Sequence, residues 1–93
     1  MTTVVFSNIS ATTAPFALAV GQYILFGNAA NWGGGLNLQL LSPDGLTWLN
    51  VASASRNANG VSDPIMLAAG SYRVQLATMT GLYLSISAVS GAP

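Results

Sequence analysis

The fold class is decided by residues 36–51, which read LNLQLLSPDGLTWLNV. Three leucines alternate with polar residues at the start of this stretch, the period of two expected of a strand with one buried face. Residues 42–45 then combine Ser, Pro, Asp and Gly in an order that suits a tight turn. A second run, residues 46–51, is rich in side chains that favour strands. The stretch therefore predicts a β-hairpin.

The same pattern of strands and turns continues on both sides of this hairpin. The predicted elements are strands at 3–9, at 16–26 (two, or one bent at Gly21) and at 82–88, a second hairpin at 64–76, and irregular connections at 28–35 and 52–62. Short strands at this spacing, with almost no helical pattern, are typical of two packed sheets. We expect an all-β fold, an antiparallel β-sandwich of seven to eight short strands, with a jelly roll as the candidate topology.

One domain is expected to span residues 1–93, with a loose tail at 90–93 and no internal repeat. The run containing Leu67, Gly70 and Tyr72 resembles the corner sequences of many sandwich domains, in which a tyrosine hydroxyl ties the start of a strand to the preceding turn. The predicted core consists of Phe6, Leu18, Val20, Tyr23, Leu25, Leu36, Leu38, Leu40, Trp48, Ile65, Leu67, Tyr72, Val74, Leu76, Leu82, Leu84 and Ile86.

Charge is the most unusual feature of the composition. Asp44, Asp63, Arg56 and Arg73 are the only Asp, Glu, Lys or Arg residues among 93, where about a quarter is usual. Two arginines cannot neutralise the several phosphates that nucleic-acid binding requires, so no nucleic-acid partner is expected. A neutral surface provides little repulsion between copies, which favours association. The alternative is a monomer hydrated by its Asn, Ser and Thr side chains.

Catalytic side chains are scarce. The chain has no His, Cys, Glu or Lys, the residues that usually act as general bases or zinc ligands. Asp44 and Asp63 each lie beside a proline in a turn-like stretch, so we interpret them as caps for backbone amides. Three glycines, 33–35, lack the Lys and Ser or Thr that follow in a phosphate-binding loop. We therefore expect no enzymatic activity, no cofactor and no metal.

Two aromatic residues are candidates for an interface. Trp48 and Tyr72 are assigned to the core, which leaves Trp32 in a glycine-rich loop and Tyr83 on the polar face of a strand as the exposed rings. Exposed aromatic side chains commonly anchor protein interfaces. They also stack on sugar rings, so a carbohydrate-binding module is an alternative.

The most apolar segment, residues 16–26, is shorter than the roughly 20 residues that a membrane-spanning helix needs. No Lys or Arg precedes Arg56, so the positive residues of a secretion leader are missing. We expect no membrane partner and no secretion signal.

The residues from 33 to 88 resemble the small β-sandwich decoration (cement) proteins of tailed bacteriophage capsids. The similar features are a glycine-rich stretch leading into an amphipathic strand at 33–40, the turn and strand at 42–48, the step Ala58-Asn59-Gly60-Val61, and residues 67–74. The resemblance implies a virion protein that is made in the host cytoplasm and sits on the outer capsid surface. It implies a homotrimer that bridges subunits of the major capsid protein. A tail or baseplate accessory protein is the other virion alternative.

Overall fold

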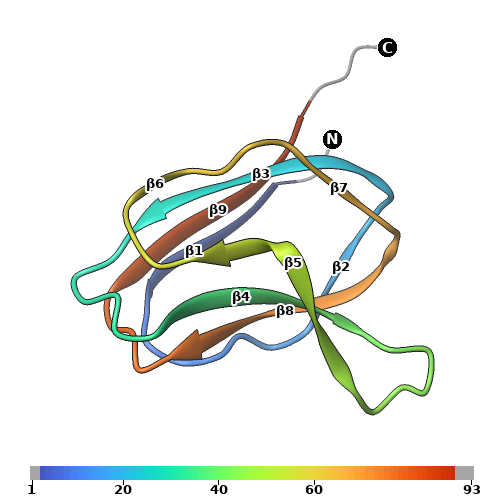
Figure 1. Cartoon of the computed structure of the whole chain (residues 1–93), viewed down its shortest axis with the longest axis horizontal. Helices are drawn as coiled ribbons and strands as arrows, with labels where there is room; N and C mark the ends of the chain where they lie inside the picture. Colours follow the sequence, from blue (N-terminus) through green and yellow to red (C-terminus); the bar gives the residue numbers. More distant parts are fainter. Residues whose placement is uncertain (1–2, 90–93) are drawn as a thin grey trace.

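The computed structural model describes residues 3–89, apart from the side chains at positions 3, 52 and 53. The tail predicted at 90–93 lies outside the described residues. Within them, nine strands and no helix form two packed antiparallel sheets (Figure 1). The predicted β-sandwich is therefore confirmed, with one or two strands more than expected.

The order of the strands is that of a jelly roll, because the pairs are nested along the chain. Sheet A contains, in order, β1 (Thr3–Ile9), β9 (Leu82–Ala88), β3 (Gly21–Asn28) and, along the far edge of β3, both β6 (Gly60–Val61) and β7 (Ile65–Leu67). Sheet B contains, in order, β2 (Phe16–Leu18), β8 (Gly70–Ala77), β4 (Gly35–Leu41) and β5 (Trp48–Arg56). The first strand thus pairs with the last, and the two middle strands with each other.

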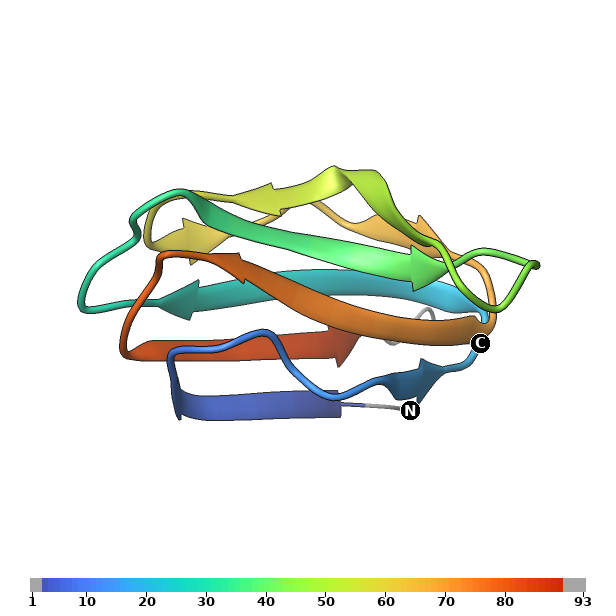
Figure 2. The same cartoon turned by 90° about the horizontal axis from the view of Figure 1, so that it is seen from below.

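The hairpin predicted at 36–51 is confirmed as β4 and β5, which pair in sheet B. Their connecting turn projects from one end of the sandwich, as both views show (Figure 1, Figure 2). β5 begins at Trp48 rather than at residue 46, because the Asp44 carboxylate accepts hydrogen bonds from the amides of Leu46 and Thr47 (2.8 and 2.9 Å). It then extends to Arg56, into the stretch predicted to be irregular.

The second predicted hairpin, at 64–76, is wrong. β7 pairs with β3 in sheet A, whereas β8 pairs with β2 and β4 in sheet B, so the chain changes sheets between them. The predicted tyrosine corner makes this crossing: the Tyr72 hydroxyl donates to the Ala68 carbonyl oxygen at 2.6 Å. The same device joins β2 to β3, where the Tyr23 hydroxyl donates to the carbonyl oxygen of Ala19 at 2.7 Å.

These two corners belong to an internal repeat, which corrects the expectation that there is none. Residues 15–23 read PFALAVGQY and residues 64–72 read PIMLAAGSY, with five of nine positions identical at an offset of 49 residues. The strand pairs are related in the same way. Gly21 pairs with Leu67, and their counterparts at the offset of 49 residues, Gly70 and Leu18, pair with each other.

Hydrogen bonds outside the strands repeat in the same way. The Thr13 amide donates to the Val74 carbonyl oxygen (3.0 Å), and Ser62, 49 residues later, donates to Leu25 (2.8 Å). Each hydroxyl of this Thr and Ser also accepts a hydrogen bond from the amide of the same partner, at 3.0 and 2.9 Å. The two halves of the chain therefore hold each other by matched contacts, related by a pseudo-twofold axis that exchanges sheet A with sheet B.

The core lies between the sheets and largely matches the predicted set. Its buried members are Leu18, Tyr23, Leu25, Leu36, Leu38, Ala54, Ile65, Leu67, Tyr72, Val74, Met79, Leu82, Leu84 and Ile86. Phe6, Leu40 and Leu76 are partly buried against them.

Two core assignments are wrong. Val20 is 71% exposed because it lies in the corner between β2 and β3. Trp48 lies on the outer face of sheet B, where its ring stacks with the Arg73 guanidinium. Ala54 and Met79 are buried but were not predicted. Ala54 lies where the β4–β5 register shifts, and Met79 lies in the connection between β8 and β9.

Candidate functional site: the outer face of sheet A

One row of paired residues crosses the middle of sheet A. Val5 pairs with Ser85, Ser85 with Phe26, and Phe26 with Val61, so their side chains project on the same side. The flanking residues on β3 and β9, such as Leu25 and Leu84, are buried in the core, which places this row on the outer face. Exposure of the apolar members is 63% for Val5, 38% for Phe26 and 65% for Val61.

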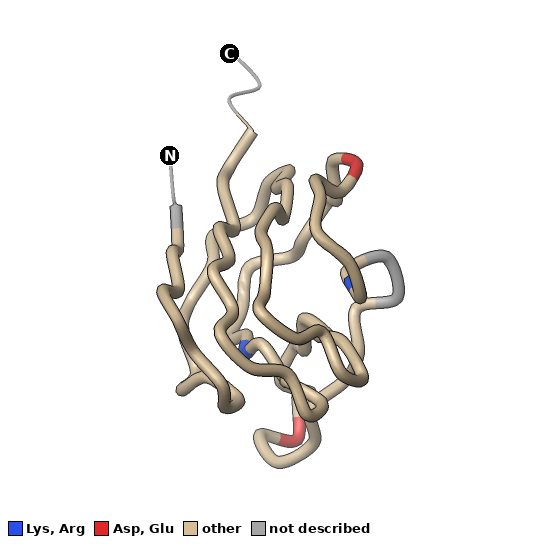
Figure 3. The backbone as a smooth tube through the Cα atoms, turned by 90° about the vertical axis from the view of Figure 1, so that its left-hand side faces the viewer, with Lys and Arg blue, Asp and Glu red and all other residues tan. Residues whose placement is uncertain are grey.

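Three further side chains extend this apolar surface. Ile24 is two residues from Phe26 on β3, Met66 lies between two buried residues of β7 and is 70% exposed, and Tyr83 on β9 is 48% exposed. We call the six residues Val5, Ile24, Phe26, Val61, Met66 and Tyr83 the apolar face. It contains no Asp or Arg, and Figure 3 shows the four charged residues widely spaced along the backbone.

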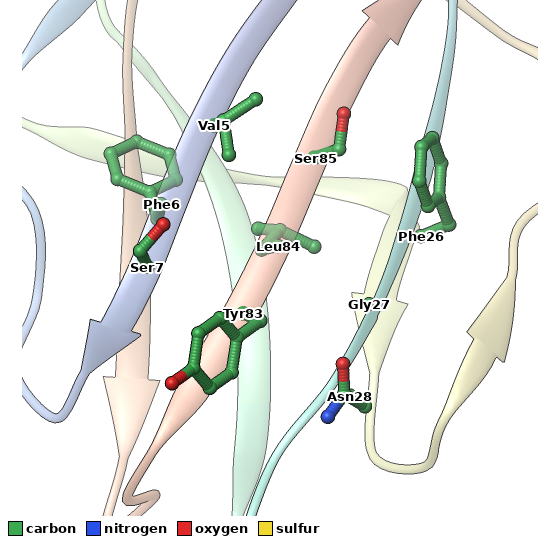
Figure 4. Close-up of a pocket in the computed structure, with 9 residues that line it drawn as sticks. All are labelled: Val5, Phe6, Ser7, Phe26, Gly27, Asn28, Tyr83, Leu84 and Ser85. Atoms are coloured by element: carbon green, nitrogen blue, oxygen red, sulfur yellow. The ribbon is translucent and has the colours of Figure 1, made fainter.

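A groove of about 210 Å³ runs along the apolar face. Val5 and Phe26 stand on its two sides and Ser85 forms the floor between them, with the Tyr83 ring at one end (Figure 4). The floor is nearly closed to solvent, since Ser85 is 9% exposed, and its hydroxyl is hydrogen-bonded to that of Ser87 at 2.7 Å. The floor therefore requires no polar group from a partner, and a partner's apolar side chain could fill the groove.

The outer face of sheet B has the opposite character. Arg73 donates from Nε to Gln39 Oε1 (2.7 Å), and Gln39 donates from Nε2 to Asn50 Oδ1 (2.9 Å). Because a guanidinium can only donate, Arg73 sets the orientation of both amides. Its Cζ lies 4.7 Å from the centre of the Trp48 ring, a cation–π contact. A second polar row parallels the first: Ser55 donates to Asn37, and Asn37 donates to Gln75.

The internal repeat allows the two faces to be compared position by position. At the offset of 49 residues, Ile24 corresponds to Arg73 and Phe26 corresponds to Gln75. The corresponding outward-facing positions of β8 thus carry charged and polar residues where β3 carries apolar ones. Exposed apolar side chains gathered on one face of a small domain commonly mark a contact surface.

Of the two predicted interface residues, Tyr83 belongs to the apolar face. Trp32 is half-buried against the core, and its Nε1 donates to Asn59 Oδ1 at 2.8 Å. Trp32 does not line the groove beside Tyr83. The sequence carried a signal for the residues we missed: the run 23–26 is apolar on both strand faces, so two of its side chains have to point away from the core.

The two aspartates lie apart from this face. The pKa of Asp44 is lowered, chiefly by the Leu46 amide and then by Thr47, whose hydroxyl donates to Oδ2 at 2.8 Å. Asp63 lies in the connection between β6 and β7. In the part of the chain that the structure describes, no three Asp, Glu, His or Cys residues gather as metal ligands do, and no helix could cross a membrane.

Comparison with known proteins gives no match to a protein-family model, a curated protein or a solved structure. The function of this chain therefore has to be inferred from the outer faces of sheets A and B.

Proposed function

We propose that this protein is a structural component of a virion: a homo-oligomeric decoration protein that binds the outer surface of a bacteriophage capsid and stabilises contacts between major capsid protein subunits. The observation that carries the proposal is the apolar face, whose exposed side chains water solvates poorly. A permanent assembly would cover this surface and remove its apolar side chains from water.

Other features of the chain fit a static role. Two of the crossings between the sheets, from β2 to β3 and from β7 to β8, are each held by the hydroxyl of a buried tyrosine. The Asp44 carboxylate is engaged within its own turn and has no histidine or lysine to act with, so it is poorly placed for acid–base work. Contacts made by an uncharged surface should also persist in high salt, because screening acts on charges.

The alternative of a carbohydrate-binding module rested on Trp32 and Tyr83 as a pair of exposed rings. Because Trp32 is half-buried with its indole N–H already bonded to Asn59, no observation favours that function.

Capsid binding is the direct test. The purified protein is mixed with shells of the major capsid protein encoded near its own gene and sedimented, and the melting temperature of the shells is measured with and without it. We expect co-sedimentation that survives 1 M salt, on the order of ten times the ionic strength at which the Debye length is 10 Å, and a higher melting temperature. Failure to bind the shells, or gold labelling confined to the tail of intact virions, would refute the proposal.

A further inference from the structure

We infer that the apolar face is where two copies of this chain join, face to face about a twofold axis. The inference deepens the proposed function and rests on its homo-oligomer: it assigns the apolar face to the contact between copies. It begins from the comparison of the two sheets: the corresponding outward-facing positions of sheet B are polar, whereas those of sheet A are apolar, which points to a contact on sheet A.

Charge indicates a second copy as the occupant. The apolar face has no Asp or Arg, and the whole chain has a formal net charge of +0. Arg56 and Asp63 line a pocket with Val61 at one edge of the face and carry opposite charges. Two copies therefore meet no net long-range repulsion as they approach. The free protein exposes this face from the moment it folds, and another copy is the partner that is always present.

Shape points in the same direction. Phe26 stands beside the groove whose opposite wall is Val5. In a twofold pair the same patch meets itself, so each residue that contacts another is contacted by it in return. A twofold axis that sets Phe26 of one copy against the groove of the other would form the reverse contact at the same time. One patch thus supplies both the projecting ring and the space that receives it.

The size of the face sets the expected strength of the pair. Pairing through the whole outer face of sheet A, which is four strand positions about 4.8 Å apart and up to eight residues of about 3.3 Å long, would cover on the order of 500 Å² per copy. A pair would then bury about 1,000 Å² in total, the lower limit for a specific interface. We therefore expect a dissociation constant on the order of micromolar, to be strengthened on a particle that holds many copies close together.

Sedimentation equilibrium of the full chain over about 1 to 500 µM, a range chosen to span the expected constant, tests the pairing. We expect the mass to rise from 9.5 kDa to twice that value. The variant Ile24→Arg/Phe26→Gln takes its residues from the equivalent positions of sheet B, and we expect it to pair at least ten times more weakly. Ala17→Arg adds the same positive charge to the outer face of sheet B, where Ala17 is exposed, and should pair like the wild type.

A second measurement does not depend on the folding of the double variant. The chain has no cysteine, so Tyr83→Cys and Ala17→Cys each introduce one unique thiol, on opposite sheets. We expect the thiol at position 83 to react more slowly with a maleimide as protein concentration rises, and the thiol at position 17 to react at a constant rate.

The inference is overturned by a wild-type chain that stays monomeric at the highest concentration, by a dimer that the double variant leaves intact, or by concentration-independent labelling at position 83. A trimer would also overturn the twofold pairing, and would fit the resemblance to decoration proteins instead. Capsid binding is tested separately: monomers that bind shells would contradict the pairing and the homo-oligomer but not capsid decoration, and dimers that do not bind shells would contradict capsid decoration but not the pairing.

Discussion

Removing the hydroxyl of Tyr72 tests whether the corners hold the two sheets together. The Tyr72 side chain is fully buried, and its hydroxyl donates to the Ala68 carbonyl oxygen at 2.6 Å. Tyr72→Phe keeps the ring and deletes this bond. Because Ala68 itself is exposed, water can reach part of the freed carbonyl, so we expect the ordinary net cost of about 1 kcal/mol rather than the larger cost of a fully buried orphan.

Urea unfolding followed by circular dichroism measures this change, with the slope of the transition expected to stay constant. The melting temperature should fall by roughly 4 to 8 °C per kcal/mol in a domain of this size. Tyr23→Phe should behave alike because it breaks the equivalent bond. Tyr83→Phe is the matched control on the surface, where changes normally stay within about 0.5 kcal/mol. Equal free energies of unfolding for Tyr72→Phe and Tyr83→Phe would refute the reasoning.

The pH dependence of stability tests the hydrogen bond between Tyr72 and Ala68 in a second way. Burial, and then the neighbouring Tyr23, raise the pKa of Tyr72 above the ordinary tyrosine value of 10.0. The folded state therefore retains the phenolic proton at a pH where the unfolded chain loses it. Stability should be unaffected by this group below about pH 10 and should decline above it. Tyr72→Phe should decline less steeply, whereas an unchanged alkaline slope would contradict the assignment.

Four other substitutions test the described contacts. Gly27→Ala would drive a Cβ into the backbone of β9, so the free energy of unfolding in urea should fall by about 2 kcal/mol or more. Gly45 has open space around it but a φ of 74°, so Gly45→Ala should cost about 1 kcal/mol. Equal costs would contradict this steric explanation. Asp44→Ala should lower the melting temperature at neutral pH and lose that deficit as the pH falls below about 4, because the depressed pKa of Asp44 stabilises the fold only while it is ionised. Arg73→Lys keeps the charge but not the planar contact, so it should cost about 1 kcal/mol and shift the fluorescence of Trp48; an unchanged spectrum would argue against stacking.

The sequence predicts this fold best where the signal is local. The hairpin at 36–51 combines a turn and alternating residues within one short stretch, and nothing distant alters it. The stretch 64–76 has equally good local signals for a hairpin, yet its two strands enter different sheets. That outcome depends on pairing with β2 and β3, whose residues lie about fifty positions away, and no local pattern contains it.

The candidate site was only partly predictable for a similar reason. Tyr83 is out of phase with the buried residues of its strand, so its exposure could be predicted from alternation. Phe26 and Val61 belong to the same surface only because β3 lies between β9 and β6, which is a property of the topology. The internal repeat could have been found by comparing residues 15–23 with 64–72, and it would have indicated which apolar residues the fold can spare.

The two similar corners also affect how the chain reaches its native state. The strands that flank one corner pair with those that flank the other, about fifty residues away, so much of the chain must close before either corner is stable. The corresponding corner of another molecule offers the same hydroxyl, amide and carbonyl groups, so pairing between chains competes with pairing within one chain. At high concentration, refolding chains should therefore exchange halves and become trapped as interlocked species with native strand content, so dilute refolding should give the better yield.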